Sequence, residues 1–136
     1  MTEDADDRSG DAGSNIPHDL SMRLATEGER SRVDELFDAL SHRRRRLVLY
    51  YLKANEQTTL DELADWVATI EARPNGSEAT AEQREAAAID LFHIHLPKLA
   101  DLKVIEYDRR SGDARYRDPP ETVDQLLRAA AVMEFE

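Results

Sequence analysis

The stretch "LFHIHLPKLADLKVIEYD", residues 91–108, contains the change from helical to strand spacing that decides the fold. Its leucines recur at helical spacing as far as Leu102, and the residues that follow alternate as in a β-strand. The continuation "RRSGDARYRDPP", residues 109–120, turns at Ser111 and Gly112 and predicts a second strand. A long helix is therefore expected to lead directly into a β-hairpin.

The predicted hairpin has a register that its side chains favour. With Ser111 and Gly112 at the tip, aromatic and oppositely charged residues face one another across the two strands. The expected pairs are Tyr107 with Tyr116, Glu106 with Arg117, and Asp108 with Arg115.

Helical spacing also dominates the residues before this stretch. Apolar residues at 33, 36, 37 and 40 predict a first helix, and Ser41 is the expected N-cap of a second, "HRRRRLVLYYLKAN". The capping boxes "TLDE" at 59–62 and "TAEQ" at 80–83 open a third helix and a long fourth one. Pro119 and Pro120 introduce a last helix.

This order of elements predicts a mainly α fold with a small β-hairpin: a winged helix-turn-helix with an additional C-terminal helix. We expect the winged helix-turn-helix domain at residues 31–118 and the C-terminal helix at 119–136. Residues 1–30 carry eight acidic residues against three arginines and show little apolar periodicity. They are predicted to form a disordered acidic tail.

The composition narrows the classes of function. Acidic residues outnumber basic ones by 29 to 18, and only three of the basic residues are lysines, which is typical of proteins from organisms with molar salt in the cytoplasm. The absence of cysteine excludes disulfides and thiolate metal sites. No apolar run is long enough to span a membrane, and the acidic start is unlike a signal peptide, so we expect a cytoplasmic protein. No catalytic motif is evident, which predicts a protein that is not an enzyme and needs no cofactor.

Three segments, "FDALSHRRRRLVLYYLK", "TTLDELADWVA" and "LFHIHLPKLADLKVIEYD", resemble a family of small haloarchaeal winged-helix domains that is related in outline to the arsenical-resistance-type repressors. The resemblance covers about residues 33–117 and implies a winged-helix fold and a DNA-binding role. The family more often has proline after "LSH", where this chain has Arg43. Metal-sensing relatives use cysteines or clustered histidines and acids, and this chain has no cysteine to match them.

The two histidines of the opening stretch suggest a metal site at first sight. At 100° per residue, the core-facing residues of this helix are expected to be Ile89, Phe92, Leu96 and Leu99. His93 and His95 would then lie about 200° apart around the axis, one on each flank, where one ion cannot reach both. We therefore expect no metal, two histidines hydrogen-bonded at the edge of the core, and a bend at Pro97.

On the same assumption the face of this helix that points away from the core would be poor in base-reading side chains. It would present Leu91 and Ile94, which could contact thymine methyl groups or a protein partner, beside Lys98, with Arg84 near the helix start. The full set on that face would be Ala87, Asp90, Leu91, Ile94, Lys98 and Asp101.

Arginines supply the remaining candidates for DNA contact. The run at 43–46 surrounds a helix, so its members cannot all face one phosphate backbone. Arg43 and Arg44 could bind either phosphates or internal carboxylates, whereas Arg45 and Arg46 are expected to pair internally. The hairpin, or wing, places further positive charge at its tip and on its return strand, at Arg109, Arg110, Arg115 and Arg117.

These observations favour a transcriptional regulator that binds double-stranded DNA, with a recognition helix at about 81–102 and the wing at about 103–117. The alternative is a winged-helix module that binds a protein and no longer binds DNA, because the chain is acidic and its expected recognition face is poor in base-reading residues. The last helix has an apolar stripe that predicts a homodimer, with a helix folded back on its own core as the alternative. The candidate dimer residues are Val123, Leu126, Leu127, Ala130 and Met133.

Overall fold

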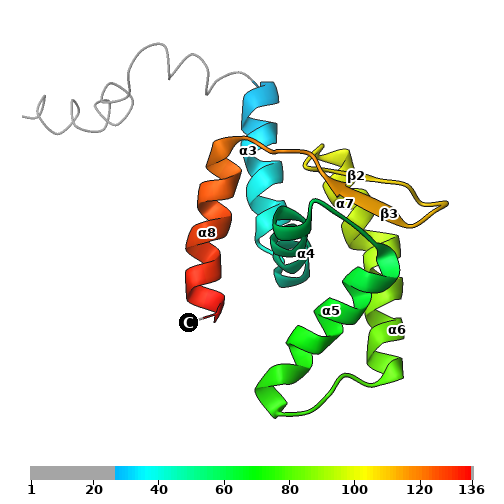
Figure 1. The fold of residues 1–136 in the computed structure, drawn as a ribbon. Coiled ribbons are helices and arrows are strands. Elements are labelled where there is room, and N and C mark those ends of the chain that lie inside the picture. The colour runs from blue at the N-terminus through cyan, green and yellow to red at the C-terminus, as the bar shows by residue number, and fades with distance from the viewer. Residues whose placement is uncertain (1–26, 136) are drawn as a thin grey trace, which may run out of the picture. The chain divides into compact units, whose positions relative to one another are not determined.

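The computed structural model describes residues 27–135 (Figure 1). The predicted acidic tail, except for the few residues from Glu27 on, lies outside the described residues. The chain forms two compact units, and the boundary between them lies between Glu35 and Leu36. The hydrophobic core and the sheet belong to the unit that begins at Leu36. The elements are α3 (Glu27–Leu40), α4 (Arg43–Asn55), β1 (Gln57–Thr59), α5 (Leu60–Ala72), the 3-10 turn η1 (Arg73–Asn75), α6 (Ala81–Asp90), the π-helix η2 (Leu91–His95), α7 (Leu96–Asp101), β2 (Ile105–Tyr107), β3 (Asp113–Tyr116) and α8 (Glu121–Phe135).

The fold class is confirmed: the described chain is mainly helical, with a small antiparallel sheet and a C-terminal helix, an arrangement compatible with a winged helix. The sheet has the strand order β1-β3-β2, so β3 is central. Strand β1 was not predicted, because its three residues "QTT" are polar and follow a helix end at Asn55. Its partner is β3, where Thr58 pairs with the buried Ala114.

The hairpin exists, but its predicted register is wrong by two residues. Tyr107 pairs with Ala114 and Glu106 with Arg115. The loop is longer than expected, because the Gly112 N–H donates to the Asp108 carbonyl at 2.8 Å and Gly112 adopts a left-handed φ of 82°. The Asp108 carboxylate also accepts from the Arg110 N–H at 2.9 Å. These bonds stabilise a four-residue loop in place of the expected two-residue turn.

Both predicted capping boxes are present, at Thr59 with Glu62 and at Thr80 with Gln83. Each satisfies otherwise unpaired backbone N–H groups at a helix start. The predicted N-cap at Ser41 is wrong. Its hydroxyl donates to the Asp38 carbonyl at 2.7 Å and so closes α3, and α4 begins after His42 without a side-chain cap.

The long fourth helix is interrupted by one π turn, η2. The Leu96 N–H donates to the carbonyl of Leu91, five residues earlier. Pro97 has no N–H to offer the preceding turn, so the usual bond to the His93 carbonyl cannot form. A π turn inserts one additional residue and rotates everything on one side of it relative to the other. The bend expected at Pro97 thus takes the form of a change in register.

This change overturns the predicted faces of the helix. Ala87 and Leu91, expected to be exposed, are fully buried, whereas Ile89, expected in the core, is 54% exposed. After the π turn, Leu96 and Leu99 are buried as predicted. They join the core built by Leu47, Val48, Leu52, Leu63, Val67, Ile105 and others on α4, α5 and the sheet.

The corrected faces predict opposite effects for two neighbouring substitutions. Leu91→Ala should lower the free energy of unfolding by about 2–5 kcal/mol, because it leaves a cavity in the core. Ile94→Ala should change it by less than about 0.5 kcal/mol, because Ile94 is 53% exposed. Urea unfolding of both variants measures the difference. Equal losses would contradict the register set by the π turn.

Candidate nucleic-acid interface

The outward face of α6 and η2 is a stripe of four exposed residues, Glu82, Ala86, Ile89 and His93. Their spacing of four, three and four follows a helix face opposite the buried Ala87 and Leu91. We call this the outer stripe. In a helix-turn-helix, this is the position of the residues that meet base edges.

The wing tip lies next to the outer stripe. The Arg109 guanidinium lies over the Phe92 ring, 4.9 Å from its centroid. This contact stabilises the wing against the helix through a cation–π interaction, typically about 0.5–1 kcal/mol at an exposed site. The phenylalanine ring stands edge-on to His93, with the ring centroids 4.9 Å apart. Arg109 at the wing tip therefore lies beside the stripe.

A buried network holds the π turn against α4. The His95 side chain is 2% exposed, its Nε2 lies 2.8 Å from the Asp90 carboxylate, and its Nδ1 lies 3.4 Å from the Arg45 guanidinium. Arg44 then joins Asp90, at 2.9 Å, to Glu71 at the end of α5. The prediction of a hydrogen-bonded histidine is confirmed for His95, at a position deeper than the edge of the core.

These contacts determine the protonation state of His95. A guanidinium can only donate, so Nδ1 must accept from Arg45, and Nε2 must carry the proton that is donated to Asp90. Burial lowers the pKa of His95 below its ordinary 6.5 and outweighs the opposing charge of Asp90. His42, whose ring centroid is 4.4 Å away, and Arg45 act in the same direction as burial. The histidine is therefore neutral at pH 7.

Asp90 was predicted to face DNA, but it serves this network instead. Burial alone would raise the pKa of its carboxyl group. The hydrogen bond from Arg44 and the interactions with His95 outweigh that effect and hold the pKa below 3.8. An ionised carboxylate that already binds Arg44 and His95 is poorly placed to bind a base. Leu91 is excluded as a DNA contact because it is buried.

The arginine run is paired within the protein. Arg45, 7% exposed, donates to the Ala39 and Asp38 carbonyls, and Arg46 donates to the Leu40 carbonyl, so both cap the C-terminus of α3. Arg46 also binds both oxygens of Glu134 in α8, as predicted for internal pairing.

Arg43 and Arg44, which could bind either phosphates or internal carboxylates, also have partners within the protein. Arg44 binds both oxygens of Glu71 at 2.8 Å. Arg43 lies 3.4 Å from Glu134. Its side chain is more exposed than those of Arg44 and Arg46, which also form ion pairs. Arg44 is therefore a poor candidate for phosphate contact, and Arg43 is a weak one.

The remaining helix candidates are also engaged. Arg84 lies 3.6 Å from Asp65 and donates to the Ala79 carbonyl. Lys98 lies 3.4 Å from Asp38. Ile94 is exposed as predicted, but it is rotated by about 100° from His93 around the helix axis and so lies outside the outer stripe.

The wing differs from the arginine run. Arg109, Arg110, Arg115 and Arg117 are all exposed, and none of them forms an ion pair within residues 32–135. Their charge is available to an external anion at the tip and on the return strand.

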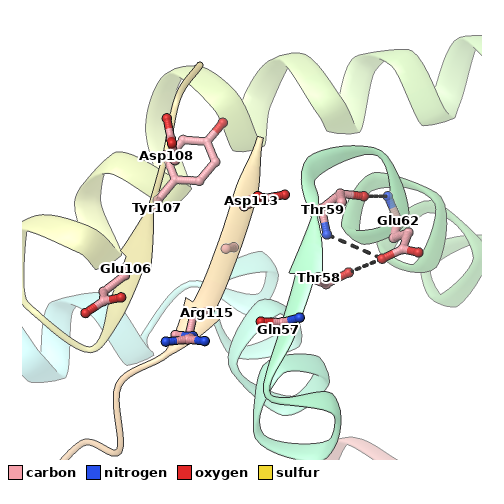
Figure 2. Close-up of a pocket in the computed structure, with 10 residues that line it drawn as sticks. Gln57, Thr58, Thr59, Glu62, Glu106, Tyr107, Asp108, Asp113 and Arg115 are labelled. Carbon is pink, nitrogen blue, oxygen red and sulfur yellow. Dashed lines mark hydrogen bonds between the residues drawn. The ribbon is translucent and has the colours of Figure 1, made fainter. Parts of the chain in front are cut away.

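Arg115 has more carboxylates around it than the other wing arginines have. Figure 2 shows it on β3, between Glu106 of β2 and Gln57 of β1. These side chains line a surface cavity of about 500 Å³. Its other charged lining residues are carboxylates, Glu62, Asp108 and Asp113. Arg110 and Arg117 are therefore the clearest free cations of the wing.

Residues 37–115 match the family described as Domain of unknown function (DUF7344). The chain belongs to this family. The matched range covers more than half of the chain, begins in α3, and includes the π turn and most of the wing. No curated protein and no solved structure matches the chain.

Helix α8 lies outside the range matched by DUF7344 and packs onto α4. Two of the predicted dimer residues, Val123 and Leu127, are buried in the core, so they are unavailable to a partner and that part of the prediction is wrong. Met133 is 84% exposed. It borders a groove whose lining is largely apolar and includes Phe37, Leu40, Leu126 and Ala130.

Two further properties concern only the described part of this DUF7344 chain. Across residues 27–135, no helix is both long and apolar enough to cross a membrane. Over the same residues, no three potential ligands among His, Asp and Glu are close enough to hold one metal ion.

The neutral state of His95 predicts a pH dependence of stability. Because its pKa is lowered in the folded state, the unfolded chain binds more protons below pH 6.5, and stability falls as the pH decreases. The contribution of His95 is fully present above pH 6.5 and should decline towards pH 5 by at most about 1.4 kcal/mol per pH unit.

Urea unfolding between pH 7.5 and 5 measures this slope. His95→Gln should flatten it, whereas the exposed control His93→Gln should leave it unchanged. Parallel slopes for wild type and His95→Gln would contradict the lowered pKa of His95 in the folded protein.

Proposed function

We propose that the protein is a cytoplasmic transcriptional regulator that binds double-stranded DNA. One observation carries the proposal. The arginines at 43–46 are paired with carboxylates or carbonyl groups of the protein itself, whereas the wing arginines have no carboxylate partner within residues 32–135. Exposed arginines without internal partners suit phosphate oxygens, which guanidinium groups bind with two parallel hydrogen bonds.

The proposed docking places the outer stripe in the major groove. The wing then lies over the neighbouring backbone, because Arg109 holds its tip beside Phe92. Arg110 and Arg117 would bind phosphates. Glu82 begins the stripe and, as an acceptor, would suit a cytosine amino group rather than a phosphate.

Acidic residues near the start of α6 set a condition on this function. Asp61, Asp65 and Glu85 lie around Arg84 in the shallow cavity between α5 and α6. At low salt they would repel DNA. At molar salt the Debye length falls to about 3 Å, so only groups in direct contact interact strongly. Binding is therefore expected in molar KCl, where short-range contacts outweigh the net charge of −11.

The same acidic cavity favours a second candidate function, a module that binds a basic protein surface. Its four carboxylates, Asp61, Glu62, Asp65 and Glu85, would complement lysine or arginine side chains. The exposed Ile89, one helical turn after Glu85, would add an apolar contact. Such a partner would engage the start of α6 and not the wing, so the two candidates differ in their dependence on Arg110 and Arg117.

A homodimer is part of the proposal. The groove between α3 and α8 has a largely apolar lining, and Met133 and Phe37 stand exposed at its rim. Burying such side chains against a second copy would stabilise a two-fold contact. Sedimentation equilibrium in molar KCl should show a dimer for the wild type and a monomer for Met133→Glu. A wild-type monomer at all micromolar concentrations would remove this part of the proposal.

Selection of genomic DNA fragments by the purified protein in molar KCl tests DNA binding. Arg110→Ala with Arg117→Ala should weaken binding of the enriched fragments by about tenfold or more, because each lost charge-assisted bond is worth about 1.5–3 kcal/mol at full strength.

The matched control is Arg73→Ala with Arg128→Ala, which removes two exposed arginines outside the wing and should leave affinity unchanged. If no fragment is enriched, the DNA-binding proposal should be abandoned. Equal losses for the two double variants would show only an effect of net charge.

A further inference from the structure

The outer stripe has an apolar centre. Ile89 is 54% exposed, and it follows Ala86 at one helical turn. A large apolar side chain at the most exposed line of a helix offers contact area to a partner that docks on that face. Arg109 of the wing lies over Phe92, next to His93 of the stripe, so an occupant that is both anionic and locally apolar would fit.

Polar side chains that normally identify bases are committed elsewhere along this helix. Gln83 accepts from the Thr80 N–H at 2.9 Å, so its amide oxygen is occupied by the capping box. Arg84 is bound to the Ala79 carbonyl and Lys98 is paired with Asp38. Bidentate recognition of guanine by arginine or lysine, or of adenine by glutamine, therefore lacks a free donor set on α6–α7.

We infer that the DNA sites of this protein carry thymines at the centre of the helix-facing sequence, whose 5-methyl groups contact Ile89 and Ala86. This inference rests on the proposed function and states which base the helix would recognise. The thymine methyl is the only apolar group that the four bases present in the major groove. A helix whose exposed centre is Ala and Ile can distinguish bases there by that group.

Contacts of this kind also suit the salt conditions that the composition indicates. Screening weakens interactions between separated charges at molar salt, whereas burial of apolar surface does not depend on charge. The wing arginines would fix the position of the helix, and Ile89 would supply the preference for thymine. Each methyl group removed from a contact should cost about a three- to fourfold loss of affinity.

The test uses an enriched duplex in which single thymines are replaced by deoxyuridine, which lacks only the 5-methyl group. For the wild type, replacing one contacted thymine should weaken binding by about three- to fourfold, and one or two positions in the duplex should show this penalty. Ile89→Ala should weaken binding of the thymine duplex and should remove most of the difference between thymine and deoxyuridine. Ile94→Ala is the control, because Ile94 has nearly the same exposed fraction, 53%, on another side of the same helix.

The outcomes separate this inference from the function on which it rests. If enriched DNA binds equally well with every thymine replaced, or if Ile89→Ala leaves the deoxyuridine penalty unchanged, the inference is overturned and DNA binding stands. An Ile94→Ala variant that abolishes the penalty would overturn the assignment of the contact to Ile89. If no DNA sequence is enriched, the inference falls together with the proposed function.

Discussion

The hydrogen bonds of His95 are the constraint on which the rest of the structure depends. Pro97 cannot continue the ordinary bonding of its helix, and the chain responds with a π turn whose last residue is His95. That turn brings the imidazole inside, where Arg45 and Asp90 satisfy both ring nitrogens. Through Asp90, Arg44 and Glu71, the same network ties the helix to α4 and α5.

The network decides which residues the helix presents. Before the π turn, Ala87 and Leu91 face the core, and Ile89 and His93 therefore face out. Without the additional residue, a helix that kept Leu96 and Leu99 buried would turn Ile89 towards the core. A proline at one position thus sets the chemistry of a surface two turns earlier. The proline changes hydrogen bonds only within its own helical turn, but it changes the direction in which residues two turns away point.

Much of the fold could be predicted from sequence, because capping boxes and apolar periodicity act locally. Thr59 with Glu62 and Thr80 with Gln83 fixed two helix starts correctly. The exposed faces could not be predicted, since the choice between a bend and a π turn at Pro97 depends on partners 50 residues away, such as Arg45. Strand β1 and the hairpin register likewise depend on tertiary pairing with β3.

Among the candidate site residues, those of the wing kept the exposure expected of them, whereas Leu91 on the helix is buried and Asp90 is partly buried. Wing positions need only a turn between two strands, which composition indicates. Whether a helix residue is exposed depends on its angle around the helix axis over several turns. One inserted residue therefore exposes Ile89 in place of Leu91. The signal that could have warned of this is Pro97 itself, because proline within a long helix often accompanies a break in the bonding pattern.

Because the chain has no cysteine, single cysteine substitutions test the central claim directly. We expect Ile89→Cys and Ile94→Cys to react rapidly with a maleimide in the folded protein, and Ala87→Cys to react only on unfolding. Enriched duplex DNA should slow the reaction at position 89 and leave position 94 unaffected. Rapid reaction at position 87, or equal protection of positions 89 and 94, would contradict the register and the DNA-facing stripe proposed for this helix.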